Sequence, residues 1–188
     1  MNLPNKLTLS RVIAIPIFIV LFILGTLSKN VIGNGINIYR AMAAAIFVVA
    51  SITDYFDGKI ARERNLITNF GKLMDPLADK MLVITAMILL TESKEVNYLC
   101  TLVVVLRELT ISSIRLIALE KGIVIAASIW GKLKTSTQMV SLVLILFNFY
   151  RLNGLAYYLT YILFYISTAF VIISLVDYII KSKEVFLS

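Results

Sequence analysis

Two pairs of aspartates are the residues of this sequence best suited to a chemical role. Asp54 and Asp57 are three positions apart, and Asp75 and Asp79 are four apart, so each pair lies on one face if its segment is helical. The chain contains no histidine and a single cysteine, which leaves carboxylate oxygens as the available ligands. Such oxygens suit hard cations such as Mg²⁺, Mn²⁺ or Ca²⁺, and two ions side by side clamp phosphate oxygens.

The aspartates also have an ordinary structural interpretation. Charged helix ends at a membrane boundary often form only local ion pairs, here with Lys59, Arg62, Lys72 and Lys80. Asp75 followed by Pro76 could begin a helix, with the aspartate as N-cap. Gly58 and Ala61 favour a functional site, because they leave space beside Asp54 and Asp57 on the same helix face. Small residues of this kind also serve plain helix packing in membranes.

The composition indicates that these residues are positioned by membrane helices. Of the 188 residues, 60% are hydrophobic, against about 45–50% in soluble domains, and the mean hydropathy is +0.91. We expect an all-α integral membrane protein with a single domain over residues 1–188 and six spans of roughly 20 residues. The expected spans are Leu9–Leu27, Ile38–Ile60, Pro76–Leu90, Val96–Leu119, Ile129–Phe149 and Leu155–Ile180. A loop of about a dozen residues would join the second span to the third.

The distribution of basic residues predicts the orientation. With the N-terminus in the cytoplasm, fourteen of the 18 lysines and arginines are assigned to the cytoplasmic side and four to the outer side. Arg107 is one of the fourteen, but it is mid-span and counts only loosely; the asymmetry is strong without it. Both termini are therefore expected in the cytoplasm, and both aspartate pairs at the inner boundary. The net charge of +7 suits anionic lipids or phosphorylated substrates better than nucleic acid, because the basic residues do not form a patch with aromatic residues.

The spacing Asp54-x2-Asp57-Gly58-x2-Ala61-Arg62-x8-Gly71-x3-Asp75-x3-Asp79 resembles the signature of the CDP-alcohol phosphatidyltransferase family. Members of this family move a phosphatidyl group from CDP-diacylglycerol to an alcohol and release CMP. The resemblance implies that the aspartates bind two Mg²⁺ or Mn²⁺ ions on the diphosphate, and that Asp79 also deprotonates the acceptor hydroxyl. It implies a nucleotide site lined by Gly58, Ala61, Arg62 and Gly71.

Four further cationic residues bear on the identity of the acceptor. Arg107 lies near the middle of the fourth span, where a charge is costly and should face a cavity or a partner. Arg115 follows two turns later, and Lys132 and Lys134 open the fifth span. Together they predict a pocket for an acceptor that carries its own phosphate. Alternatively, Arg107 pairs with Glu108 and the lysines bind lipid headgroups. We expect Glu108 to be a poor partner, because adjacent helical residues point about 100° apart.

The flanking segments resemble those of bacterial phosphatidylglycerophosphate synthases, a branch of the same family. The resemblance rests on the segment 2–11 and on the motifs Arg107-Glu108-x6-Arg115 and Gly131-Lys132-x-Lys134-Thr135. It implies glycerol 3-phosphate as acceptor, places Asn5, Thr8 and Arg11 at the nucleotide end of CDP-diacylglycerol, and suggests a homodimer in a bacterial cell membrane.

Other functions stay open at this point. The same chemistry could serve inositol phosphate, serine or phosphatidylglycerol as acceptor. A prenyltransferase also uses aspartate-rich magnesium motifs, but its pairs are further apart and the Gly58-x2-Ala61-Arg62 element would be unexplained. A cation transporter would use the aspartates as an ion path, and it would place them near the middle of the membrane.

Overall fold

The computed structural model of the chain is a bundle of six long helices. It describes residues 3–28, 31–32, 36–63, 69–121 and 128–183, without the side chains of 3–8, 31–32, 36, 54–63, 69–79 and 119. The elements are α1 (Leu3–Leu27), β1 (Val31–Ile32), β2 (Ile36–Asn37), α2 (Ile38–Glu63), α3 (Asn69–Glu92), α4 (Tyr98–Glu120), α5 (Ile129–Leu146), the 3-10 helix η1 (Phe149–Arg151) and α6 (Gly154–Lys181).

The six expected helices are thus present, and their ends follow local chemistry. Ser128 caps α5 by accepting a hydrogen bond from the Trp130 backbone, and Asn153 caps α6 in the same way through Ala156. Between α3 and α4, Lys94 adopts a left-handed conformation with φ of 60°. The Glu95 backbone N–H then reaches back to the carbonyl of Leu90, which closes the end of α3.

Two expectations about the aspartate region are wrong. Helix α2 continues to Glu63 and α3 already begins at Asn69, so residues 64–68 alone separate them, not about a dozen. Asp75 and Pro76 lie inside α3, which excludes Asp75 as the N-cap of that helix. Helices α2 and α3 are both longer than the apolar runs in their sequences, because backbone hydrogen bonding continues past the point where side chains become polar.

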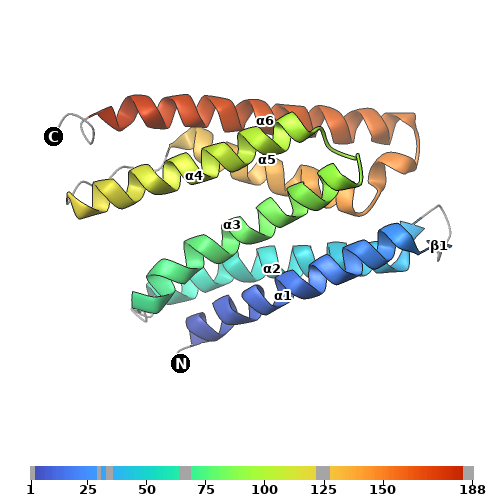
Figure 1. Cartoon of the computed structure of the whole chain (residues 1–188), viewed down its shortest axis with the longest axis horizontal. Coiled ribbons are helices and arrows are strands. Elements are labelled where there is room, and N and C mark those ends of the chain that lie inside the picture. The colour runs from blue at the N-terminus through green and yellow to red at the C-terminus, as the bar shows by residue number, and fades with distance from the viewer. Residues whose placement is uncertain (1–2, 29–30, 33–35, 64–68, 122–127, 184–188) are drawn as a thin grey trace.

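The helices form two groups of three (Figure 1). Helices α1, α2 and α3 pack together, as do α4, α5 and α6, and the groups meet where α3 contacts α4 and where α5 contacts α2 and α3. A short antiparallel pair, β1 with β2, joins α1 to α2. Both termini lie at the same end of the bundle as the α2–α3 and α4–α5 connections, and the β1–β2 pair lies at the other end.

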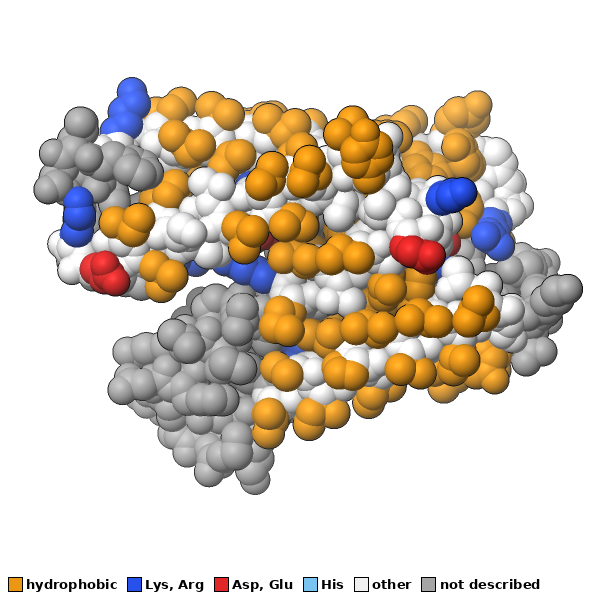
Figure 2. All heavy atoms as spheres, viewed as in Figure 1, with side chains coloured by type: hydrophobic (Ala, Val, Ile, Leu, Met, Phe, Trp, Pro, Cys, Tyr) orange, Lys and Arg blue, Asp and Glu red, His pale blue; other side chains and the backbone are white. Residues whose placement is uncertain are grey.

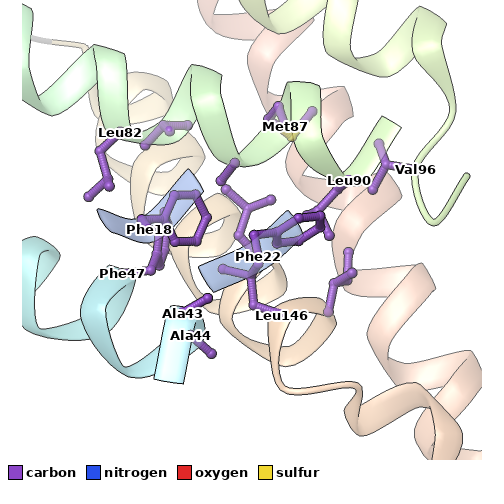
Figure 3. Packing of buried hydrophobic residues seen from close by; sticks show 14 of the residues in the cluster. Phe18, Phe22, Ala43, Ala44, Phe47, Leu82, Met87, Leu90, Val96 and Leu146 are labelled. Carbon is purple, nitrogen blue, oxygen red and sulfur yellow. The ribbon is translucent and has the colours of Figure 1, made fainter. Parts of the chain in front are cut away.

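The hydrophobic core lies where the two groups meet (Figure 3). Phe18 and Phe22 of α1 and Phe47 of α2 are fully buried, with ring centroids about 6 Å apart for Phe18 with each of the other two. Leu82 of α3 completes the cluster within the first group, and Leu146 of α5 joins it from the second group. This packing holds α2, α3 and α5 in fixed positions next to the candidate site.

The outer surface is unusually apolar (Figure 2). Hydrophobic side chains cover the middle of the visible face, and charged side chains gather toward its two ends. The exposed hydrophobic residues of the bundle include Ile13, Val20, Leu106, Leu109 and Ile162, each more than half exposed. Within the described residues, two segments are long and apolar enough to cross a membrane, Leu9–Leu27 and Gly154–Lys181, and Ile38–Thr53 is apolar but shorter. An apolar belt of this size is typical of a protein in contact with lipid.

Candidate active site

The signature residues lie on two helices that contact each other. Helix α2 carries Asp54 and Asp57 one turn apart, and α3 carries Asp75 and Asp79 one turn apart. Gly58, Ala61 and Arg62 are also in α2, Gly71 is in α3, and Asn5 and Thr8 are in α1. The side chains of all these residues lie outside the described residues, so their roles stay predictions. The four aspartates offer only oxygen donors, which suit a hard divalent cation.

The side chains that the structure describes offer no alternative metal site. Among them, no group of three or more histidine, cysteine, aspartate or glutamate side chains is close enough to hold an ion. The four aspartates of α2 and α3, whose side chains are not among those described, stay the candidate ligands.

The four cationic residues expected to hold the acceptor line one cavity of about 460 Å³. Arg107 and Arg115 come from α4, and Lys132 and Lys134 from α5. Further lining residues are contributed by α3 through α6: Lys80, Val83, Glu108, Ile111, Ser128, Gly131, Thr135, Ser136, Gln138, Met139, Ser174 and Tyr178. The cavity is therefore strongly cationic, and its binding of a phosphorylated acceptor stays a prediction.

Glu108 is the centre of an ion-pair network in this cavity. Its Oε1 lies 2.7 Å from Arg107 Nη1 and 2.7 Å from Lys134 Nζ, and all three side chains are at most 12% exposed. The expectation that Glu108 is a poor partner for Arg107 is therefore wrong. The Cα–Cβ directions do diverge, but the arginine side chain is long enough to bring its guanidinium back to the neighbouring carboxylate.

The guanidinium of Arg107 is fixed on a second side as well. Its Nε donates to Ser174 Oγ of α6 at 3.2 Å. A Cβ added to Gly131 of α5 would lie 3.7 Å from Arg107 Nη2, so α5 passes directly beside the guanidinium. Arg107 thus has one defined orientation in the cavity before any ligand arrives, which reduces the entropy lost on binding.

Lys80 connects the cavity to the aspartate segment. It follows Asp79 in α3, lines the cavity, and donates a hydrogen bond to Ser112 Oγ of α4. Ser112 in turn donates to the backbone carbonyl of Glu108. This chain of contacts ties α3 to α4 next to the network around Glu108, so that the cationic cavity borders the stretch of α3 that carries Asp79.

The two lysines of α5 differ in environment. Lys134 is buried and bound to Glu108, whereas Lys132 is exposed at the edge of the cavity. Arg115 is also exposed and lies two turns after Arg107. The cavity therefore has an inner, pre-organised pair of cations in Arg107 and Lys134 and an outer pair in Arg115 and Lys132.

Arg11 of α1 does not line the cationic cavity. It is 2% exposed and lines a smaller hollow of about 340 Å³ between α1 and α2, together with Ala14, Ala50 and Thr53. Thr53 directly precedes Asp54, so Arg11 borders the aspartate segment from the α1 side. A larger hollow of about 630 Å³ at the opposite end of the bundle is lined largely by tyrosines and contains none of the expected site residues.

Ser174 and Tyr178 of α6 were missed in the sequence. A signal for Ser174 existed: Thr160, Ser167 and Ser174 recur every seven residues in an otherwise apolar helix, and all three are buried. A polar residue repeated along one face of an apolar membrane helix indicates a face turned toward protein or a cavity. Which cavity it faces depends on the packing of α6 against α4, which the sequence does not reveal.

Comparisons with known proteins agree with these observations. Residues 1–173 match the family model described as CDP-alcohol phosphatidyltransferase. A protein of Bacillus subtilis (strain 168) named CDP-diacylglycerol–glycerol-3-phosphate 3-phosphatidyltransferase is 34% identical over 187 residues, which cover 97% of this chain and 96% of the relative. Proteins with the same name are 38% identical in Shigella flexneri serotype 5b (97% and 95% covered) and 42% identical in Rickettsia typhi (75% and 74% covered).

The family match covers both signature helices, α4 and α5, and it covers α6 as far as residue 173. The chain belongs to the CDP-alcohol phosphatidyltransferase family, a family of transferases.

Proposed function

We propose that this protein transfers the phosphatidyl group of CDP-diacylglycerol to glycerol 3-phosphate, giving phosphatidylglycerophosphate and CMP. The observation that carries the proposal is the cationic cavity beside the α3 segment that bears Asp79. The names of the relatives support the same donor and acceptor. A single domain of the chain performs the reaction.

The charge of the cavity favours a phosphorylated acceptor. Five cationic side chains line it, Lys80, Arg107, Arg115, Lys132 and Lys134, against the single described carboxylate of Glu108. Glu108 compensates one of these charges and leaves a surplus that a phosphate group can neutralise. Unphosphorylated glycerol carries no anionic group, and the carboxylate of serine is balanced by its own ammonium group. With these acceptors the buried cations would have no phosphate to offset the free energy that their burial costs.

The aspartates supply the second half of the site. Members of the family generally depend on a divalent metal, and Asp54, Asp57, Asp75 and Asp79 would hold two Mg²⁺ or Mn²⁺ ions. Such ions neutralise the diphosphate of the donor and orient it. Gly58, Ala61, Arg62 and Gly71, with Asn5 and Thr8, bind the cytidine end of CDP-diacylglycerol.

Asp79 accepts the proton of the acceptor hydroxyl. The oxygen of that hydroxyl then forms a bond to the phosphorus that bears diacylglycerol, and the bond from this phosphorus to the CMP oxygen breaks. CMP leaves with the electron pair. In phosphoryl-type displacements, positioning and charge neutralisation contribute most of the rate, and a rigid cationic pocket next to the base meets this requirement.

The family is membrane-associated, and we place the protein in the bacterial cell membrane as a six-span homodimer. Both termini and the active site face the cytoplasm in this arrangement. It is supported by the positive charges of the sequence and by the shared end of the termini and the two connections nearest the site (Figure 1). The lipid donor would keep its acyl chains in the bilayer while its diphosphate meets a water-soluble acceptor.

The test is CMP release by the purified full chain, with CDP-diacylglycerol as donor and a panel of acceptors. We expect release with glycerol 3-phosphate, little with glycerol, serine, inositol phosphate or phosphatidylglycerol, and none in excess chelator. Faster release with another acceptor would reassign the reaction within the family. Undiminished CMP release in excess chelator would show that the reaction does not require metal ions.

A further inference from the structure

Tyr178 has a buried hydroxyl that makes no hydrogen bond to any part of the chain that the structure describes. The residue is 4% exposed, and its side chain lines the cationic cavity. Leaving a buried polar group unsatisfied costs about 1–3 kcal/mol, and such groups are rare in native proteins. A phenylalanine would fill the same space without that penalty, so the hydroxyl requires an explanation.

The position of the ring is set by its neighbours. Tyr178 packs against Ile111 and Ile114 of α4, with Leu175 beside them. Ser174 lies one turn earlier on the same face of α6 and accepts the hydrogen bond from Arg107. Tyr178 therefore belongs to the α6 face that borders the Arg107 guanidinium, and its ring is held by apolar contacts that do not involve the hydroxyl.

We propose that the Tyr178 hydroxyl donates a hydrogen bond to an oxygen of the phosphorylated acceptor, and so positions and selects that substrate. The assignment rests on the proposed function of the cavity. It explains why the hydroxyl has no described protein partner in the ligand-free protein: its partner is the substrate. The bond forms in the cavity that Arg107 and Lys134 also line, and a hydrogen bond to a charged phosphate is stronger than one between neutral groups.

The proposal predicts that the variant Tyr178→Phe keeps its stability without ligand but binds glycerol 3-phosphate more weakly. Without ligand, the variant should unfold at the same temperature as the wild type or slightly above it, because no protein hydrogen bond is lost. Its dissociation constant for glycerol 3-phosphate should rise about 10- to 100-fold, the range for a hydrogen bond to a charged group. The Michaelis constant for CDP-diacylglycerol should not change.

The measurement is calorimetric titration of the detergent-solubilised full chain with glycerol 3-phosphate, together with thermal unfolding with and without this ligand. Tyr165→Phe is the matched control, since Tyr165 is on the same helix but lines the hollow at the opposite end. This control should leave the affinity for glycerol 3-phosphate unchanged. Arg107→Gln is a second reference, because it should weaken binding whether or not Tyr178 takes part.

Three results would overturn the inference. An unchanged affinity in Tyr178→Phe, alongside weakened binding in Arg107→Gln, would exclude the hydroxyl as a ligand while leaving the proposed function intact. A ligand-free variant that unfolds several degrees earlier, or fails to fold, would show that the hydroxyl already has a protein partner. If the wild type itself does not bind glycerol 3-phosphate, the proposed function fails and the role of Tyr178 fails with it.

Discussion

Arg107 is the residue at which the acceptor pocket can be tested most specifically. Its guanidinium is held by Glu108 and Ser174, and its remaining donors are available to a phosphate. Arg107→Gln should raise the Michaelis constant for glycerol 3-phosphate about 10- to 100-fold, as expected for a lost charge-assisted hydrogen bond. The constant for CDP-diacylglycerol should stay within about twofold, because the donor binds at the aspartates.

Steady-state kinetics with each substrate varied in turn measures both constants. Arg151→Gln is the control, since Arg151 lies against Tyr150 at the opposite end of the bundle. If both Michaelis constants rise equally in Arg107→Gln, the residue supports the whole site and does not define an acceptor pocket.

A substitution of Asp79 can distinguish the role of a general base from that of a metal ligand. Asparagine keeps the shape of the side chain but cannot take a proton, and loss of a general base typically slows a reaction about 10²–10⁴-fold. Asp79→Asn should therefore lose turnover while it retains binding of CDP-diacylglycerol. Turnover is measured as CMP release, and donor binding by titration. A variant that no longer binds the donor would identify Asp79 mainly as a metal ligand, and near-normal turnover would exclude it as the base.

At the scale of single residues, the sequence was informative where the role of a residue depends on its neighbours in the chain. The spacing of the aspartates predicted a shared helix face, and the cost of a charge at mid-span predicted that Arg107 faces a cavity. The ion pair with Glu108 was considered but judged poor, because helical directions describe Cβ atoms and not the reach of a long side chain. Ser174 and Tyr178 were missed because they reach the cavity from α6, some 70 positions further along the chain than Arg107.

At the scale of helices, the close contact of α1 with α2 depends on a glycine. A Cβ added to Gly25 would lie 2.6 Å from Arg40 Cγ and 2.8 Å from the Arg40 backbone nitrogen. Arg40 is itself held by a buried ion pair with Glu95 at 2.7 Å and lies over the ring of Phe22. The side chain cannot move away without loss of those contacts, and the backbone contact remains in any case.

Gly25→Ala should therefore destabilise the protein by about 1–3 kcal/mol, the usual range for overpacking. Gly154→Ala is the matched control, because a Cβ there meets nothing within 4 Å. Thermal unfolding of both variants in detergent measures the difference. Equal unfolding temperatures would mean that α1 and α2 adjust their separation freely, which would contradict the close packing described here.

The number and order of the helices could be predicted from the apolar runs, since each run is bounded by charged residues, glycine or asparagine. The exact ends of α2 and α3 could not, because a helix extends into polar sequence wherever backbone hydrogen bonds are maintained. The antiparallel pairing of Val31–Ile32 with Ile36–Asn37 was also not foreseen.

At the scale of the whole molecule, the two three-helix groups contribute different parts of the candidate site. The first group contains the helices with the aspartates, and the second provides most of the cationic cavity, with Lys80 of α3 crossing between them. No periodicity within one segment can reveal the contact of α3 with α4 or the packing of α6 on α4, because both depend on contacts between distant parts of the chain. The function was nevertheless accessible from sequence, since the signature occupies two consecutive helices.

The central claim is the joining of a phosphatidyl group to glycerol 3-phosphate. The most direct measurement supplies the purified protein with CDP-diacylglycerol, Mg²⁺ and glycerol 3-phosphate labelled in its carbon skeleton, and follows both CMP and lipid-soluble label. We predict equal molar amounts of CMP and of labelled phosphatidylglycerophosphate, with both lost in excess chelator. Release of CMP without entry of the label into lipid would contradict the account, because the phosphatidyl group would then have gone to water or to another acceptor.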